Sequence, residues 1–334
     1  MSYRLPGVNV HQILMRASQA LADSELLPCL VGPLYQVVKD SAITLTLPIA
    51  GSTTVVYPSL KVGAIIENSS ISIKVKNAKI AIIAPLTAIT GLTFTAGNPT
   101  VTSTTTTFTN VKAGDILQLS GNAGTYTVLS VGSDFKSVTF TSNVNYVPSA
   151  QTYGVSRSVG DVIATIGSPT YTATNFSFTS LTYGPSTITS GTGYISYVAL
   201  RRDLLGFYEV TDQSTLALDM DIDPLNPLGF NAGLVAPAAS GGRNILLYIL
   251  SDYTEAEYLA AYEQLSVRRD SYFIVPILNT GANTQTFNNS IMTAASSNAI
   301  AMSDPSISYF RSAFVITPLV DETTLTHATY TVGV

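Results

Sequence analysis

The chain has 334 residues and a formal net charge of −5, and only 11% of its residues are charged whereas 46% are hydrophobic. Its 16 basic residues are thinly spread and form no patch suited to phosphate binding, so we exclude nucleic acid as a partner. The longest apolar runs, Ala78–Leu86 and Ile245–Leu250, are shorter than the about 20 residues of a membrane helix, and no secretory signal pattern is present. We therefore expect no membrane insertion, and synthesis in the cytoplasm.

Residues 1–25 are predicted to form an extended arm. The stretch "LPGVNVHQI" (Leu5–Ile13) alternates as a strand does, but it has no local hairpin partner. Such a segment is suited to adding a strand to the sheet edge of another subunit. The predicted inter-subunit residues are Pro6, Gly7, Val8, Asn9, Val10, His11 and Ile13, with His11 on the free polar face.

An α/β core is predicted to begin with the apolar strand Leu26–Leu34, within residues 26–40. Cys29, the only cysteine, lies in this strand, which favours a small buried side chain over a reactive thiol. From residue 41 to 194 the composition shifts to Thr, Ser, Val, Ile and Gly in short alternating runs, which predicts a β-rich insertion folded as a barrel or sandwich. Residues 115–141 are predicted to form a meander with turns at 121–124 and 132–134.

The core is predicted to resume over residues 195–320. Residues 241–278 carry strand, helix and strand signals in succession, which indicates a βαβ unit. The helix is predicted to start at Thr254 with Glu257 in capping-box spacing and to pack one face on the sheet, and Arg268 and Arg269 are expected in its last turn. The buried face is predicted to hold Tyr258, Leu259, Tyr262 and Leu265.

A second helix is predicted at Ser290–Met302 and a third apolar strand at Ser312–Val320. Residues 321–334 are predicted to be a C-terminal extended strand, because His327–Val334 alternates. Its predicted contact residues are Thr329, Tyr330, Thr331 and Val332. The fold class is therefore α+β or α/β: an α/β core of parallel strands with covering helices, a large all-β insertion, and extended terminal arms.

The sequence offers little for catalysis. The two histidines, His11 and His327, lie in the terminal segments, away from the ends of core strands. Asp219, Asp221 and Asp223 alternate, but a calcium loop needs Gly at its sixth position and Glu at its twelfth, where this chain has Pro224 and Phe230. A turn at Asp223-Pro224 is favoured over a metal site. The glycines at 191–193 and 241–242 match no nucleotide motif and are interpreted as loops. We expect no enzymatic activity, no metal and no cofactor.

Several stretches, in order, resemble the sheath proteins of contractile bacteriophage tails. "LPGVNVHQI" resembles the opening arm of that family, and "LLPCLVGPL" resembles its first core strand. Further on, "YVALRRDLLG", "DIDPLNPLGFNAGL", "YLAAYEQLSVRRDSYFIVPIL" and "AMSDPSISYFRSAFVI" resemble its successive core motifs. The resemblance implies a subtilisin-like sheath core without protease activity. Most members continue into a C-terminal domain that contacts the inner tail tube, and we expect this chain to lack it. It is then a fragment, a naturally short relative, or a chain whose other segments meet the tube, and the sequence leaves these alternatives open.

The resemblance implies a structural virion protein of the phage tail, assembled in the host cytoplasm. Its partners would be further copies of itself in hexameric rings or a helical polymer, the tail tube protein, and the baseplate and tail terminator proteins. Contraction of this polymer would drive genome ejection. Two alternatives remain open from the sequence. One is a tail decoration or host-receptor-binding protein that uses the β insertion, and the other is an α/β hydrolase that works without histidine.

Overall fold

The computed structural model describes residues 27–88, 92–93, 95–119, 125–144, 152–210, 216, 220–239, 245–268, 271–278, 285–303 and 311–313. They form two compact units, each assembled from separate stretches of the chain. Unit 1 holds residues 27–37, 61–66 and the described residues from 198 onward. Unit 2 holds residues 38–60 and the described residues from 67 to 197. Both helices and strands are present, strands predominate, and they form several sheets.

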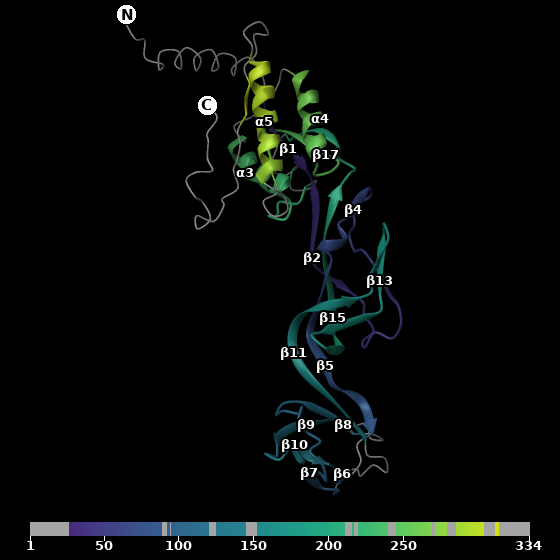
Figure 1. The fold of residues 1–334 in the computed structure, drawn as a ribbon. Coiled ribbons are helices and arrows are strands. Elements are labelled where there is room, and N and C mark those ends of the chain that lie inside the picture. Colours follow the sequence, from purple (N-terminus) through teal and green to yellow (C-terminus); the bar gives the residue numbers. More distant parts are fainter. Residues whose placement is uncertain are drawn as a thin grey trace, which may run out of the picture. The chain divides into compact units, whose positions relative to one another are not determined.

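Unit 1 is built on a five-stranded sheet. In spatial order its strands are β16 (Gly206–Val210), β17 (Ile245–Leu250), β1 (Leu27–Pro33), β18 (Ser271–Pro276) and β19 (Ser312–Ala313). Figure 1 labels β1 and β17 of this sheet. The central strand β1 runs parallel to both β17 and β18, and β19 is parallel to β18. β16 is antiparallel to β17. The first apolar strand in the sequence is therefore the middle of the sheet.

Helices cover both faces of this sheet. Helices α4 (Glu255–Ser266) and α5 (Gln285–Met302) pack on one face, where β1 contributes Cys29 and Val31. Helix α3 (Pro227–Ala239) packs on the other face, where β1 contributes Leu30. Because successive residues of a strand point to opposite sides, an uninterrupted apolar strand such as β1 suits a sheet that is buried on both faces. Unit 1 is a three-layer α/β structure.

The predicted βαβ unit is confirmed as β17, α4 and β18. The hydroxyl of Thr254 caps α4 by accepting the N–H of Glu257 at 3.4 Å, as the capping-box spacing predicts. The predicted buried face is wrong at Leu259, which is 45% exposed, because the helix turns a stripe of Tyr258, Ala261, Tyr262 and Leu265 toward the sheet.

The prediction that Arg268 lies in the last turn of α4 is also wrong, since the helix ends at Ser266. Its guanidinium group lies 4.3 Å from the centre of the Phe207 ring instead, and its backbone carbonyl accepts a hydrogen bond from Arg311. Arg269 lies outside the described residues. Helix α5 starts at Gln285, five residues before the predicted start. Of the third predicted core strand, only β19 lies within the described residues.

Unit 2 consists mainly of strands. Its elements are β3 (Thr53–Val56), a 3₁₀ helix η1 (Asn68–Ser70), β5 (Ser72–Ala88), β6 (Leu92–Thr93), β7 (Asn98–Ser103), β8 (Ile116–Leu119), β9 (Thr125–Val131), β10 (Ser137–Val144), β11 (Thr152–Gly167), β12 (Thr170–Tyr171), β13 (Asn175–Phe178) and β14 (Ser180–Tyr183). Two further strands, β2 (Tyr35–Ile43) and β15 (Ser186–Arg201), have residues in both units. Residues 61–66, which the sequence analysis placed in the insertion, belong to unit 1, because β4 (Ala64–Ile66) pairs with residues 199–201 of β15.

Three groups of strands make up unit 2. The long strands β15, β5 and β11 are neighbours, and β14 pairs with both β11 and β15, which closes a ring of four strands. Strands β12, β13 and β3 form a small sheet in which Phe176 stacks on Tyr57 with ring centroids 5.7 Å apart. Strands β6 to β10 continue from β11 and enclose a separate apolar core that includes Phe108, Phe140 and Tyr153. We call this last group the β6–β10 module.

The predicted meander at 115–141 is confirmed, since β8, β9 and β10 pair consecutively in antiparallel fashion. The loop interpretation of the glycines at 191–193 is wrong, because Gly191 and Gly193 lie inside β15.

Candidate functional site

The predicted inter-subunit residues lie outside the described residues. This holds for the arm residues Pro6 to Ile13, including His11, and for Thr329 to Val332, as well as for His327. Strand addition by the two ends of the chain therefore stays a prediction. The site analysis that follows concerns the side chains that the structure does describe.

The acidic stretch 219–223 forms structural contacts. The Asp221 carboxylate accepts the N–H of Val37 at 2.7 Å. Asp223 holds a turn, in which its carboxylate accepts the N–H of Leu225 and its carbonyl accepts the N–H of Asn226. The predicted turn at Asp223 is thus confirmed, whereas Asp219 lies outside the described residues. Within the described ranges, no three His, Cys, Asp or Glu side chains are grouped closely enough to hold a metal ion.

Other groups that chemistry could use are buried among apolar side chains. Cys29 is fully buried beneath α4 and α5, in agreement with the predicted small buried side chain. Burial raises the pKa of Tyr258 and of Tyr262 far above the ordinary value of a phenol, and it raises the pKa of Tyr153 to about 12. The Tyr258 hydroxyl donates to the carbonyl of Ile277, which ties α4 to the end of β18. The three tyrosines stabilise the fold and remain protonated at neutral pH.

An ion pair links β11 to Asp115, the residue that directly precedes β8 of the β6–β10 module. Asp115 is 1% exposed, and Arg157 of β11 donates to both of its carboxylate oxygens at 2.7 and 2.9 Å. The N–H of Lys112 donates to the same carboxylate at 2.8 Å. These hydrogen bonds offset the cost of removing a carboxylate from water. The pair fixes the start of β8 against β11.

The most unusual geometry of unit 2 is a row of bulges across three neighbouring strands. The register between β11 and β5 shifts twice within residues 158–162, and the register between β15 and β5 shifts twice within residues 188–192. Both pairs of shifts lie opposite residues 76–79 of β5, and each strand carries one extra residue there. Asn77, Gly160 and Gly191, with φ angles of 52°, 73° and 139°, mark this level, and we call them the bulge row.

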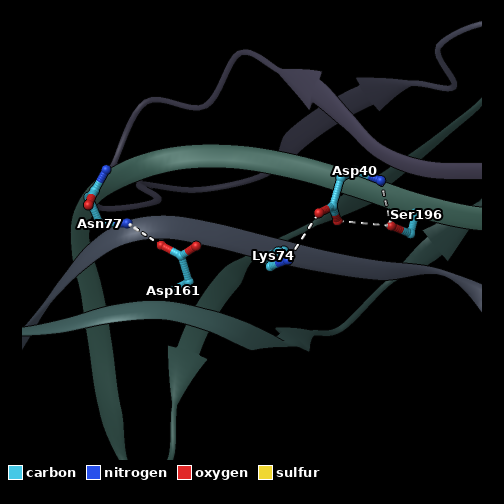
Figure 2. A network of polar contacts seen from close by, with 5 residues as sticks. All are labelled: Asp40, Lys74, Asn77, Asp161 and Ser196. Atoms are coloured by element: carbon cyan, nitrogen blue, oxygen red, sulfur yellow. Dashed lines mark hydrogen bonds and ion pairs between the residues drawn. The ribbon is translucent and has the colours of Figure 1, made fainter.

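Side chains of the neighbouring strands bind backbone groups at the bulge row. The carboxylate of Asp161 accepts the N–H of Asn77 at 3.1 Å, as Figure 2 shows. On the opposite side of β5, the hydroxyl of Thr189 donates to the carbonyl of Lys79 at 3.1 Å. Bulges bend strands and increase their twist, so this row allows three long strands to curve until β14 reaches both β11 and β15.

Next to the bulge row, Asp40, Lys74 and Ser196 form the other half of the network in Figure 2. Lys74 donates to the Asp40 carboxylate at 3.0 Å, and the N–H of Asp40 donates to the Ser196 hydroxyl oxygen at 2.9 Å. The hydrogen bond from Lys74 is the main cause that holds the pKa of Asp40 below its usual range, and the same bond raises the pKa of Lys74. A protonated Lys74 cannot act as a general base toward Ser196. The network joins β2, β5 and β15.

The β6–β10 module presents a different kind of surface. An exposed aromatic residue, Phe135, lies in the turn between β9 and β10 and has a φ angle of 57°. The backbone carbonyl of Phe135 accepts the N–H of Thr107. In the same segment, the hydroxyl groups of Ser103, Thr105 and Thr107 form hydrogen bonds with one another. The Thr-rich stretch Thr100–Thr109 is predicted from the sequence to be a strand or an ordered loop, and the structure has β7 up to Ser103 followed by a hydrogen-bonded loop. Phe135 was not singled out, and its only signal was a bulky residue in the turn "GSDFKS", at the place where Gly or Asn is usual.

Comparison with known proteins gave no matching family model, no matching curated protein and no matching solved structure. Among the helices that the structure describes, none combines the length and apolar character needed to cross a bilayer.

Proposed function

We propose that the chain is a structural subunit of a contractile phage tail sheath, which polymerises around an inner tube. The observation that carries the proposal is where the sheath-like stretches fall. "LLPCLVGPL" supplies the central strand β1, "DIDPLNPLGFNAGL" supplies the start of α3, and "YLAAYEQLSVRRDSYFIVPIL" supplies most of α4 and all of β18. These stretches are far apart in the sequence, yet all of them belong to unit 1. If the chain shares the core fold of sheath proteins, the occurrence of these motifs together has a physical reason, because all of them build the same core.

In this proposal, unit 2 is the variable domain that sheath-like proteins carry on their core. The chain enters it within β2 and returns within β15, so that unit 2 is inserted into unit 1. The side chains of unit 2 form apolar cores within that unit, such as the core of the β6–β10 module. A domain with its own core can vary in sequence without disturbing the sheet of unit 1.

The polymer would be held together by strand addition. An extended arm that pairs with the sheet edge of a neighbour satisfies backbone hydrogen-bonding groups and leaves a flexible connection between subunits. Such connections would persist while the subunits rearrange from a metastable extended state to a more stable contracted state. No reaction is catalysed in this scheme, and the low content of charged residues limits repulsion between closely packed copies.

Negative-stain electron microscopy of the purified chain tests the proposal. We expect tubes or rings from the intact chain, and folded particles without polymers after deletion of residues 1–13, because the deletion removes the predicted arm. His11→Ala is the matched control, since His11 is predicted to lie on the free face of the arm and its loss should leave polymers intact. Far-UV circular dichroism checks that each variant is folded. Polymers of normal length from the truncated chain would exclude the arm mechanism.

A further inference from the structure

The small sheet of unit 2 ends in strand β3, which pairs with β13 on one side only. Directly after β3, the N–H of Tyr57 donates to the carbonyl of Thr174 at 3.1 Å, which continues this pairing. In an antiparallel pair, the residues that bond to the partner strand alternate with residues that point their backbone groups away from it. Val55 and Tyr57 therefore direct their N–H and C=O groups toward β13, and Thr54 and Val56 direct theirs away from it.

The hydrogen bonds of β13 agree with this alternation. Asn175, which lies opposite Val56, directs its carbonyl to the N–H of Thr172 at 2.8 Å, on the side away from β3. Among the residues that the structure describes, none forms a hydrogen bond with the backbone N–H or C=O of Thr54 or Val56. We call these four backbone groups the free edge of β3.

The free edge of β3 lacks most of the features that keep sheet edges apart. Natural edge strands usually carry charges, a proline or a bulge, which prevent pairing with another chain. Residues 41–60 contain no charged residue, β3 contains no proline, and its register with β13 has no shift. The strand consists of threonine and valine, which favour β structure, and its Val56 side chain is 69% exposed. This edge is therefore open to a further strand.

The free edge is complementary to the same edge of a second copy. When two β3 strands meet antiparallel about a two-fold axis at Val55, Thr54 of each copy lies opposite Val56 of the other. Each of these two pairs forms two N–H···O=C bonds, so all the free groups of both edges are used. The pairing also places a threonine side chain beside each exposed Val56, and no charges repel each other because β3 has none.

We propose that the free edge of β3 binds the free edge of β3 in a second copy and joins their small sheets into one continuous sheet. The contact is isologous, so it needs no second kind of surface. It lies within unit 2 and does not depend on the terminal arm or on the proposed polymerisation. The contact is small, so we expect an association that depends on protein concentration rather than a permanent dimer.

Disulfide trapping of the full-length chain tests this register. The Cα atoms of a hydrogen-bonded antiparallel pair are about 5.5 Å apart, which a disulfide spans, whereas diagonal neighbours are about 7–8 Å apart and exceed its usual range. Thr54→Cys chains mixed with Val56→Cys chains under an oxidant should therefore give at least ten times more cross-linked dimer than either variant alone. Cys29 is buried, and the intact chain measures its background.

Thr125→Cys mixed with Thr127→Cys is the matched control. Both residues are exposed and lie two positions apart, but their strand β9 already pairs with β8 and with β10. This mixture should cross-link no more than each of its variants alone. Far-UV circular dichroism checks that all four variants are folded.

Amide exchange of the intact chain gives a second measurement without any substitution. The N–H of Val55 faces β13 and should exchange slowly at every protein concentration. The N–H groups of Thr54 and Val56 should exchange at least tenfold more slowly at high than at low protein concentration, because only pairing with a second copy protects them.

Equal cross-linking in the mixture and in the single variants would overturn the proposal, and so would exchange at Thr54 and Val56 that is independent of concentration. A mixture that cross-links only after deletion of residues 1–13 would also overturn it, because the arm would then be the strand that occupies this edge. Polymers in electron microscopy without the Thr54–Val56 cross-link would exclude β3 pairing and leave the proposed function standing. The cross-link without polymers would support β3 pairing and count against the proposed function.

Discussion

Replacing Gly191 by alanine should destabilise unit 2 more than replacing Gly160, the other glycine of the bulge row, by alanine. A Cβ atom at Gly191 would lie 2.4 Å from Cγ1 of Val75, 2.9 Å from the carbonyl oxygen of Lys76 and 3.2 Å from Cα of Ala78. Two of these neighbours are backbone atoms of β5 and cannot rotate away. The φ angle of 139° adds a second cost, because residues with a Cβ atom rarely adopt it.

The two costs can be estimated separately. Forcing a methyl group into a packed site typically costs about 1–3 kcal/mol. Placing alanine in an unfavourable positive-φ conformation costs about 1–2 kcal/mol. We expect Gly191→Ala to lower the free energy of unfolding of unit 2 by about 2–5 kcal/mol. Gly160→Ala is the matched control, because Gly160 also has a positive φ but a Cβ atom there would meet no atom within 4 Å. It should lose only about 1–2 kcal/mol.

Differential scanning calorimetry of the intact chain measures both variants, and hydrogen exchange of the amides in β5, β11 and β15 identifies the transition that belongs to unit 2. The reasoning requires a larger loss for Gly191→Ala than for Gly160→Ala, with exchange accelerated on both sides of residues 76–79. Equal losses for the two variants would mean that close packing against β5 has no energetic weight. The bulge row would then be a feature of backbone conformation alone.

Two further predictions concern ion pairs. Arg157→Ala should lower the free energy of unfolding by about 3–5 kcal/mol, because it leaves the buried Asp115 carboxylate without its charged partner. The double variant Arg157→Ala with Asp115→Ala should lose less, because it removes the buried charge as well. Urea unfolding followed by circular dichroism measures both variants, and a single variant as stable as the intact chain would contradict the expectation. The hydrogen bonds from Arg201 hold the pKa of Asp203 below its reference of 3.8, so Asp203 contributes stability that is fully present above about pH 4–5 and is lost as the pH falls through the lowered pKa. Asp203→Asn should therefore be less stable than the intact chain at pH 7, and the difference should shrink as the pH falls through the lowered pKa of Asp203 in thermal unfolding scans. A constant difference at all pH values would refute this linkage.

Local sequence signals predicted those parts of the fold that local physics controls. Thr254 and Glu257 mark the start of α4 because a hydroxyl three residues before an unpaired N–H can cap a helix. The turns in residues 115–141 separate β8, β9 and β10, because glycine and aspartate favour tight turns. The alternation of apolar residues in β5 changes phase, from Ile73 and Val75 to Ala78 and Ile80, as an extra residue requires, but this bulge was not predicted from the sequence.

Helix α3 shows where such signals fail. Its sequence contains Gly229, Gly233 and Pro237, which are poor helix formers, and it was not predicted. The structure supplies the reason for two of these residues. A Cβ atom at Gly229 would lie 2.2 Å from the side-chain nitrogen of Asn226, and one at Gly233 would lie 2.7 Å from Ile222. Close packing against the preceding turn decides these positions, and packing between segments overrides intrinsic propensity.

By itself, the sequence determined the mixed α and β character, the strand β1, the βαβ unit, and the absence of a recognisable catalytic motif. These follow from hydrophobic periodicity and from the chemistry of individual side chains, which act over a few residues. Only the tertiary structure decided that Gly191 lies inside a strand and that three bulges share one level. It also decided that the carbonyl of Phe135, in the turn between β9 and β10, accepts the N–H groups of Thr107 and Phe108 from a distant segment. Pairing between strands that are distant in sequence depends on the register of the whole sheet, which no single segment encodes.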